Sequence, residues 1–373
     1  MARQTSISHR LYTGEKSFNF IGGRRRWYML SGILVLLCFV AIFGRGLTLG
    51  IEFSGGTDFQ APMTIQEGTL DAVRAELQAA DFDDLEPQVF SLGDTTIRVQ
   101  TRALSTEETT QMRALMAELA GTDVESVTYS AIGPSWGQQV SQQALIALIV
   151  FVVLVMILIW AWFRDWRMSL AAIIPLAHDL ILTIGIYAAV GFTVTPATMI
   201  GVLTILSYSL YDTVVVFDQI RRNTAELDKS SMLYGEVVNK STNQVLIRSM
   251  NTTVIGILPV GALLVAGTML GTGPLGDLGL AMFVGMLAGA YSSIFLAAPL
   301  LVEFNKNAPR IKEHDDLVHE QRELKVRRAA EQAAAAELAD ATVASGESGA
   351  PVAPSVRNPD ARRRTTRAER KRR

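Results

Sequence analysis

The sequence is poor in the residues that build disulfides and metal sites. Its single cysteine, Cys38, lies in an apolar run, so no disulfide can form within the chain. The four histidines have no HExxH spacing, and no CxxC pair is present, so we expect no metal. The GxxxxGK[ST] phosphate loop and a nucleophile–base set are also missing. We therefore expect no cofactor and no enzymatic activity.

What the sequence does have is long apolar runs, and hydrophobic residues make up 49% of it. A bilayer core takes about 20 apolar residues as helix. Six stretches are long enough, at roughly 27–49, 141–163, 168–191, 194–217, 251–270 and 278–302. The first could be a signal peptide, but its apolar core is too long and no small-x-small cleavage site follows. We interpret it as a retained anchor and predict a helical protein with six transmembrane helices.

Lysine and arginine predict the orientation of these spans. They concentrate in the arm 1–26, the loop 164–167, the loop 218–250 and the tail from 306. Six spans place all four segments on one side, which the positive-inside rule makes cytoplasmic. Segment 50–137 has no lysine and many acidic residues, so we expect it to be exported.

The exported segment 50–137 has the pattern of a small α+β domain. Two helical stretches separate four strand candidates, and Ser105 with Glu108 forms a capping box at the second helix. Gly93-Asp94 marks a hairpin turn between the middle strands. The β-α-β-β-α-β order is that of a ferredoxin-like fold. The expected strands are 57–61, 87–92, 95–101 and 124–130.

Two further segments belong neither to the expected spans nor to the exported domain: a connector within the region 138–305, which holds spans two to six, and the tail after it. The connector near 218–250 interleaves valines with polar residues, which favours an amphipathic helix lying at the membrane interface. The tail 306–373 changes to small and polar residues; we expect helix near its start and disorder over most of it. Its arginine-rich end favours attraction to anionic lipids. Contact with ribosomal RNA or an acidic partner is the alternative, but we expect no nucleic-acid partner.

Ionisable and polar residues interrupt three of the spans. Asp212 shares one helical face with Tyr208, and Tyr211 borders that face. A carboxylate at the centre of a bilayer costs roughly 2.5–3.5 kcal/mol on insertion scales, so such residues indicate ion or proton pathways. The third span carries His178 and Asp179, and the fifth carries Arg248 and Thr252 at its cytoplasmic entry.

Each of these features has a structural alternative. Arg248 either pairs with Asp212 or extends its side chain to the membrane surface as an anchor. The His178–Asp179 pair is either functional or a structural hydrogen bond between helices. The last span has small residues at every fourth position, which lets a helix from this chain or from a partner approach closely. These small residues are Ala281, Gly285, Gly289, Ser293 and Ala297.

Several motifs in one order resemble the SecF family of protein-export membrane proteins, part of the resistance-nodulation-division (RND) superfamily. "GIEFSGGTDF" (50–59) resembles its GIDFxGGT motif, and "IGPSWGQQ" (132–139) its IGP-x-x-G segment. "HDL" (178–180), "SYSLYDTVVVFDQIRRN" (207–223) and "RSMNTT" (248–253) resemble motifs of its third, fourth and fifth spans. The resemblance covers roughly residues 18–305.

The resemblance implies a multi-pass protein of the bacterial inner membrane that works with SecD and the SecYEG translocon, with YajC as a further partner. Proton flow would drive completion of preprotein export. The family's proton-carrying aspartate falls on Asp212 and its arginine on Arg248, with His178 and Asp179 beside them. Gly55 and Gly56 are either a hinge or a plain turn. Ser207 and Tyr211 depart from the family's Gly and Asn.

Two other functions are compatible with six spans and one exported domain. The chain could be half of an RND-type proton-driven exporter of a lipid or small molecule. An exported segment of this size is too small to enclose its own substrate cleft, which favours the export role. An inert assembly scaffold is the third alternative.

Overall fold

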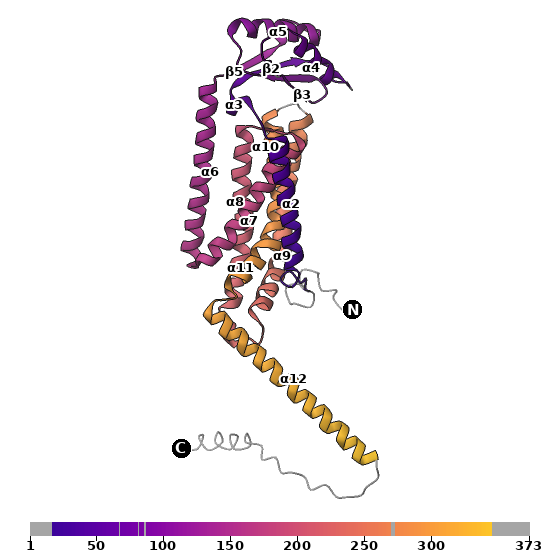
Figure 1. Cartoon of the computed structure of the whole chain (residues 1–373), viewed down its shortest axis with the longest axis vertical. Coiled ribbons are helices and arrows are strands. Elements are labelled where there is room, and N and C mark those ends of the chain that lie inside the picture. Colours follow the sequence, from indigo (N-terminus) through magenta and orange to yellow (C-terminus); the bar gives the residue numbers. More distant parts are fainter. Residues whose placement is uncertain (1–16, 67, 81, 86, 270–272, 345–373) are drawn as a thin grey trace, which may run out of the picture. The chain divides into compact units, whose positions relative to one another are not determined.

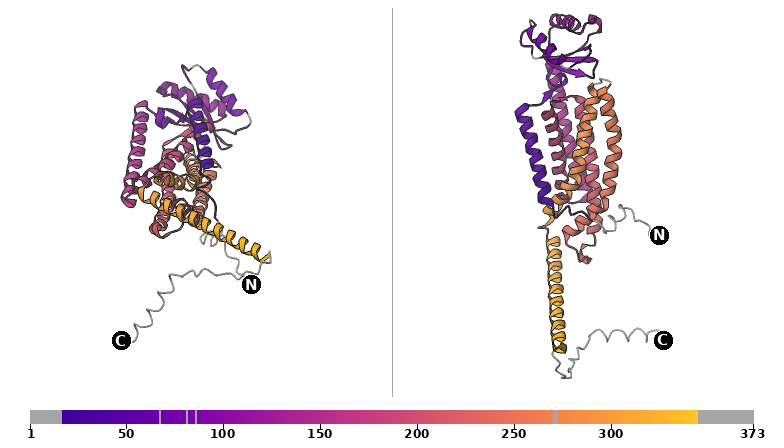
Figure 2. Two further views of the ribbon diagram at one scale, coloured as in Figure 1. Left: turned by 60° about the horizontal axis from the view of Figure 1, so that its bottom comes forward. Right: turned by 90° about the vertical axis from the view of Figure 1, so that its right-hand side faces the viewer.

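The computed structural model describes residues 17–66, 68–80, 82–85, 87–269 and 273–344. Six helices in this part are long and apolar enough to cross a membrane, as predicted (Figure 1). A small α+β domain lies at one end of their bundle, in each of the views (Figures 1 and 2). The spans are α2 Arg24–Arg45, α6 Pro134–Phe163, α7 Trp166–Val190, α8 Pro196–Thr224, the stretch Tyr234–Gly267 of α9 (Tyr234–Met269) and the composite Leu275–Asn305.

The centre of the bundle consists of α7, α8 and the last span. In their most apolar stretches 56% of the residues are buried, against 11% in α2, α6 and α9. The start of α8 is fixed by Thr195, whose hydroxyl accepts the Thr198 N–H, and by Pro196 in the first turn. The central helices are those that carry the carboxylates Asp179 and Asp212.

The last span is not a regular α-helix. It runs through α10 (Gly273–Ser292), one π-helical turn η3 (Ser293–Ala297) and α11 (Ala298–Asn305). Pro299 has no N–H to donate to the carbonyl of residue 295, and its ring would crowd that carbonyl in a tight turn. A wider π turn relieves this conflict, and such turns are frequent at functional sites.

The α+β domain has the predicted ferredoxin-like topology. Its four strands form one antiparallel sheet in the order β3-β4-β2-β5. The Ser105–Glu108 capping box is present at the start of α5. The last strand begins later than expected, because Val124–Ser126 forms a 3-10 turn. The elements are β2 Gly56–Pro62, α4 Thr69–Ala79, β3 Gln88–Leu92, β4 Thr96–Thr101, α5 Thr106–Ala120 and β5 Thr128–Ile132.

A tightly packed junction connects α2 to this domain. Strand β1 (Thr48–Leu49) pairs in parallel with β6 (Thr193–Val194), and the short helix α3 (Ile51–Ser54) follows. Gly55 and Gly56 come next, with φ of +75° and +146°, values that favour glycine. A Cβ on Gly55 would lie 2.8 Å from Pro134 Cα, and one on Gly56 would lie 2.3 Å from the Thr101 carbonyl oxygen. The two glycines therefore allow contacts that no other residue permits without a shift.

The prediction of an interface-lying helix in the connector is wrong. Helix α9 runs without a break from Tyr234 to Met269, and a short 3-10 turn (Leu227–Lys229) precedes it. Val237, Val238 and Val245 are buried against the bundle core, so their helical spacing reflects packing within the protein. The apolar pattern alone could not distinguish a bilayer surface from a bundle surface.

The tail begins with more helix than the sequence indicated. Helix α12 runs from Pro309 to Ala344, whereas residues 345–373, with the predicted disordered basic end, lie outside the described residues. Only residues up to Asp316 belong to the first compact unit. Within that unit, Arg310 forms an ion pair with Asp228, and Asp315 accepts the Tyr234 N–H.

Candidate functional site

Asp179 is the most heavily hydrogen-bonded carboxylate among the described residues inside the bundle. It lies on α7 with 3% of its surface exposed. Its Oδ2 accepts hydrogen bonds from Ser209 Oγ on α8 at 2.5 Å and from Ser292 Oγ on α10 at 2.7 Å. Its Oδ1 lies 3.2 Å from His178 Nδ1. Asp179 thus joins three helices, because a buried carboxylate needs donors on each oxygen.

His178 directs one ring nitrogen, Nδ1, toward Asp179. Its side chain is 6% exposed, and within the described part of the chain its buried Nε2 has no hydrogen-bond partner. The adjacent pair predicted from sequence is therefore in contact. The buried Nε2 can accept or donate a hydrogen bond, depending on the tautomer.

Asp212 is also buried, but it has fewer partners. It is 7% exposed, and its Oδ2 accepts a hydrogen bond from Ser249 Oγ on α9 at 2.6 Å. Across the described residues it forms no ion pair within 4.0 Å. Asp212 and Ser209 lie three residues apart on α8, so one helix face serves both carboxylates.

The predicted direct pair of Asp212 with Arg248 is not present. Arg248 is exposed, and its Nη2 makes a long contact of 3.5 Å with Tyr211 Oη. Thr252 donates its hydroxyl to the Arg248 carbonyl oxygen. Arg248 and Ser249 are neighbours in sequence and point about 100° apart around α9, so only one of them can face Asp212.

The departure of Tyr211 from the family pattern gives Arg248 its side-chain partner. Tyr211 and Tyr208 are 50% and 43% exposed, so this part of α8 presents polar groups at the bundle surface. Ser207 donates its hydroxyl to the Leu203 carbonyl oxygen and contacts neither carboxylate. Of the two departures, only Tyr211 touches a predicted site residue.

Glycines on α10 bring the last span close to α8. A Cβ on Gly289 would lie 2.8 Å from Ser209 Cβ, and one on Gly285 would lie 2.0 Å from Ile205 Cδ1. This close approach places Ser292 beside Asp179. Ala281, Ser293 and Ala297 on the same stripe are each 0% exposed. The small-residue face therefore packs within this chain.

Ser249 and Ser292 are contacts that the sequence analysis did not identify. Each of these serines is next to a residue of a predicted feature. Ser249 follows the predicted site residue Arg248, and Ser292 precedes Ser293 of the small-residue stripe. A hydroxyl in an apolar run is a weak signal, because it can also bond to its own helix backbone. Only the rotation of α9 and α10 in the bundle decides which hydroxyl reaches a carboxylate.

A small cavity lies beside Asp212 and Ser209, the serine that donates to Asp179. Its volume is about 10 Å³, and it is lined by Tyr208, Ser209, Asp212, Thr253, Met286, Gly289 and Ala290. That is room for about one water molecule, provided polar partners are present. Asp212 and the Ser209 hydroxyl are such partners. The arrangement can therefore connect Asp212 to Asp179 by hydrogen bonds.

Six spans around a buried carboxylate network define a multi-pass membrane protein with an ionisable core. Two comparisons with known families agree with this class. Residues 111–307 match the family "Protein export membrane protein SecD/SecF, C-terminal", and residues 40–62 match the "SecD/SecF GG Motif". The chain therefore belongs to the SecD/SecF family of protein-export membrane proteins.

Individual relatives show the same relationship. The protein translocase subunit SecF of Streptomyces coelicolor is 40% identical over 314 residues, covering 84% of this chain and 83% of that protein. SecF of Pseudomonas aeruginosa is 31% identical over 293 residues, covering 78% and 92%. As in these relatives, the function is that of a protein translocase subunit.

A solved structure shares the fold. The crystal structure of SecDF, a translocon-associated membrane protein from Thermus thermophilus, matches with a TM-score of 0.70 and 30% sequence identity. The match covers 79% of this chain and 39% of that one, so the chain spans about two fifths of the SecDF protein.

Proposed function

We propose that this chain uses the proton motive force to help complete preprotein export, with Asp212 as the proton-carrying group. The observation that supports this most is the position of Asp212. It is buried inside a membrane span and accepts one side-chain hydrogen bond, from Ser249. A lone carboxylate in that setting is costly when charged, so protonation strongly changes its interactions.

The carboxylate network suggests how protonation is converted into movement. A protonated Asp212 can donate a hydrogen bond, whereas the charged form only accepts one. The change alters the bond to Ser249 on α9 and the link toward Ser209 on α8. Because Ser209 also donates to Asp179, the shift reaches α7 and α10. Close-packed helices respond to such changes by moving between discrete arrangements.

The partner that we propose is SecD. The polar face formed by Tyr208, Tyr211 and Arg248 is exposed on the isolated chain. Lipid tails would leave these groups without partners, whereas helices of a second membrane subunit can supply them. The Thermus thermophilus relative is named SecDF and is more than twice as long as the stretch matched here, which agrees with such an assembly.

The remaining assignments are part of the same proposal. We place the chain in the bacterial inner membrane with both termini in the cytoplasm, acting at SecYEG and with YajC as a further partner. The basic tail would contact anionic lipids. We propose no enzymatic activity, since the relatives are translocase subunits.

The test is Asp212→Asn, assayed in inverted membrane vesicles with an imposed proton gradient. We expect gradient-dependent completion of export to be lost, while the variant still assembles with SecD. The control is Asp218→Asn on the same helix, where the carboxylate is partly exposed and pairs with Arg222. Normal export by the Asp212 variant would refute the proton role and favour a scaffold. Gradient-driven lipid release without any export defect would favour the RND-type exporter.

A further inference from the structure

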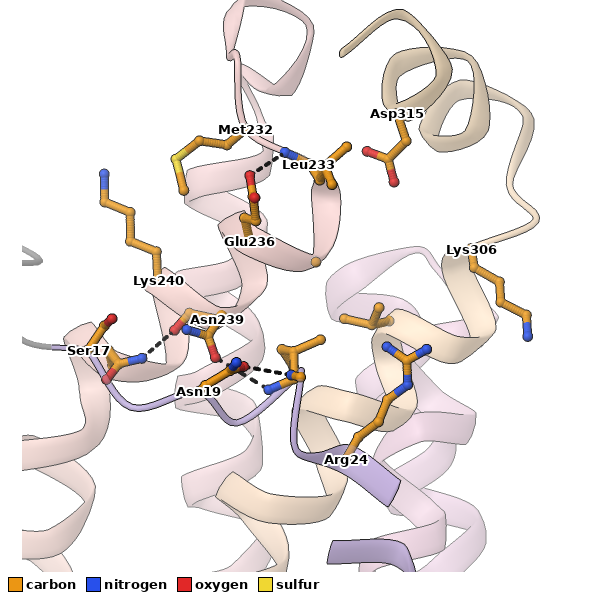
Figure 3. Close-up of a pocket in the computed structure, with 15 residues that line it drawn as sticks. Ser17, Asn19, Arg24, Met232, Leu233, Glu236, Asn239, Lys240, Lys306 and Asp315 are labelled. Carbon is orange, nitrogen blue, oxygen red and sulfur yellow. Dashed lines mark hydrogen bonds between the residues drawn. The ribbon is translucent and has the colours of Figure 1, made fainter. Parts of the chain in front are cut away.

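A cavity of about 920 Å³, drawn in Figure 3, lies at the end of the bundle opposite the α+β domain of Figure 1. Its walls come from the chain before α2, the first turns of α9, the end of α11 and the start of α12. It is separate from the carboxylate network. Among the residues that line it are Ile21, Arg24, Glu236, Asn239, Lys240, Lys306 and Asp315.

One wall is fixed in place by hydrogen bonds. Asn239 accepts the N–H groups of Phe20 and Ile21 through Oδ1 and donates to the Phe18 carbonyl oxygen. Asn243 accepts the Phe18 N–H at 2.7 Å and donates to the same carbonyl. These bonds tie residues 18–21 to α9, so the cavity is preformed.

Three basic side chains, Arg24, Lys240 and Lys306, line the cavity against two carboxylates, Glu236 and Asp315, so the lining has a surplus of positive charge. Arg24 and Lys306 share one carboxylate, Glu303, with Arg24 Nη2 at 3.7 Å from it. Lys240 lines the opposite side in Figure 3. The two lining carboxylates already accept backbone N–H groups at the start of α9: Glu236 from Leu233 at 2.9 Å and Asp315 from Tyr234 at 2.8 Å. The positive end of α9 offsets part of their charge.

The cavity also lies at the boundary between polar and apolar surface. Arg24 is the first residue of α2, and Lys306 follows the last residue of α11. Just inside that boundary, α2 exposes Met29, Leu30 and Ile33. Basic pockets between helices at the cytoplasmic surface suit anionic lipid head groups. A ligand that places a phosphate in the cavity and an acyl chain along α2 would match the polar cavity and the apolar helix surface beside it.

We propose that this cavity binds the phosphate of an anionic phospholipid from the cytoplasmic leaflet, held between Arg24 and Lys306 with Lys240 opposite. The proposal rests on the membrane orientation proposed above. A bound lipid would hold the start of α9, the helix that carries Ser249 to Asp212. Lipid composition would then influence the proton-carrying centre from the membrane surface.

The experiment titrates the purified full-length chain in neutral detergent with phosphatidylglycerol, phosphatidylcholine or inorganic phosphate, following the thermal unfolding midpoint. Phosphatidylglycerol should raise the midpoint saturably, and the other two should not. Arg24→Gln/Lys306→Gln should weaken the apparent phosphatidylglycerol affinity about thirtyfold, as expected for two basic contacts. The charge-conserving Arg24→Lys/Lys306→Arg should restore binding, which shows that the loss is not misfolding.

The matched control is Arg164→Gln/Lys229→Gln, which removes two basic groups outside the cavity lining. Equal weakening by this control would overturn the proposal, because the lipid effect would then be general surface attraction. An equal midpoint rise with inorganic phosphate would also overturn it in favour of a free-anion site. These readouts do not involve export, so their failure is distinct from failure of the Asp212 test.

Discussion

At the residue scale, the two buried carboxylates differ in how well they are satisfied. Asp179 has hydrogen-bond partners on both oxygens, whereas among the described residues the side-chain donor to Asp212 is Ser249. The hydrogen bonds of Asp179 tie α7 to α8 and α10, whereas Asp212 is bonded to α9 through Ser249. From this contrast we propose a fixed structural role for Asp179 and the proton-carrying role for Asp212.

Replacing Ser249 tests this difference directly. Ser249→Ala removes a donor from buried Asp212, which should cost about 1–3 kcal/mol of stability in the charged state. We expect gradient-dependent export in vesicles to fall, though less than in Asp212→Asn. Ser249→Thr should keep most activity. The control Ser207→Ala removes a hydroxyl that donates to the Leu203 carbonyl oxygen of its own helix, and a similar loss of export there would contradict the assignment.

In the α+β domain, Glu108 provides a pH-dependent contribution to stability. The Arg102 side chain, 2.6 Å away, and the Ser105 cap lower its pKa from 4.5 to about 2. A lowered carboxyl pKa stabilises the fold above the unfolded-state pKa, and this contribution is lost as the pH falls from about 4.5 toward about 2.

Glu108→Gln removes that titration. Between pH 5 and pH 3, the thermal unfolding midpoint of the parent should fall further than that of Glu108→Gln. The neighbouring Glu107→Gln has no capping contact and should follow the parent. If the unfolding midpoint falls equally with pH in the parent and in Glu108→Gln, the Glu108–Arg102 ion pair contributes nothing to stability.

At the element scale, the separation of α8 and α10 is set by glycine. Gly289 lies against Ser209, and the next turn of the last span carries Ser292 to Asp179. Helix rotation and spacing therefore determine the hydrogen bonds of the network. There is no space for a methyl group at this contact, so adding one would displace α8 or α10.

Gly289→Ala is expected to cost about 1–3 kcal/mol of stability through overpacking, although alanine favours helix. It should also reduce gradient-driven export by shifting Ser209 from Asp179. Gly261→Ala on α9 is the control, since a Cβ there meets nothing within 4 Å. We expect that variant to be neutral or slightly more stable in thermal unfolding. If the two variants have the same unfolding midpoint and the same export, the close packing at Gly289 does not matter to stability or function.

At the scale of the whole molecule, the α+β domain and the bundle meet through a tightly packed junction. Gly56 pairs with Ile132 in the sheet, and Gly55 lies against Pro134 at the start of α6. Movement of α6 or α2 therefore reaches the sheet directly. This packing supports the hinge interpretation of the two glycines, which stays a prediction.

Gly56→Ala tests the junction. Its Cβ would clash with the Thr101 carbonyl oxygen, so we expect faster limited proteolysis between α2 and the domain and reduced export. Gly68→Ala is the control, because Gly68 also has positive φ (+86°) but its Cβ would meet open space. It should show only backbone strain, about 1 kcal/mol. A proteolysis pattern unchanged from the parent in Gly56→Ala would argue against a coupled junction.

The sequence was sufficient for the six spans, the α+β domain and the positions of Asp179 and Asp212, because apolar runs and buried charges are local signals. It could not show that Ser249 rather than Arg248 faces Asp212. That choice depends on the rotation of α9, which contacts with other helices determine. For the same reason, the valines at 237, 238 and 245 were assigned to the wrong surface.

The π-helical turn Ser293–Ala297 has a consequence for the history of the chain. A π turn holds one residue more than an α turn, so it is what a single-residue insertion into an older, regular helix would leave behind. The extra residue rotates the side chains of α10, which precedes the turn, by about 100° from the positions they would have in an uninterrupted α-helix. An insertion at this place moves Ser292 to Asp179 and leaves the part of the span after the turn, with buried Leu301, in its register. Relatives with one residue fewer at this position should then lack the serine–aspartate bond.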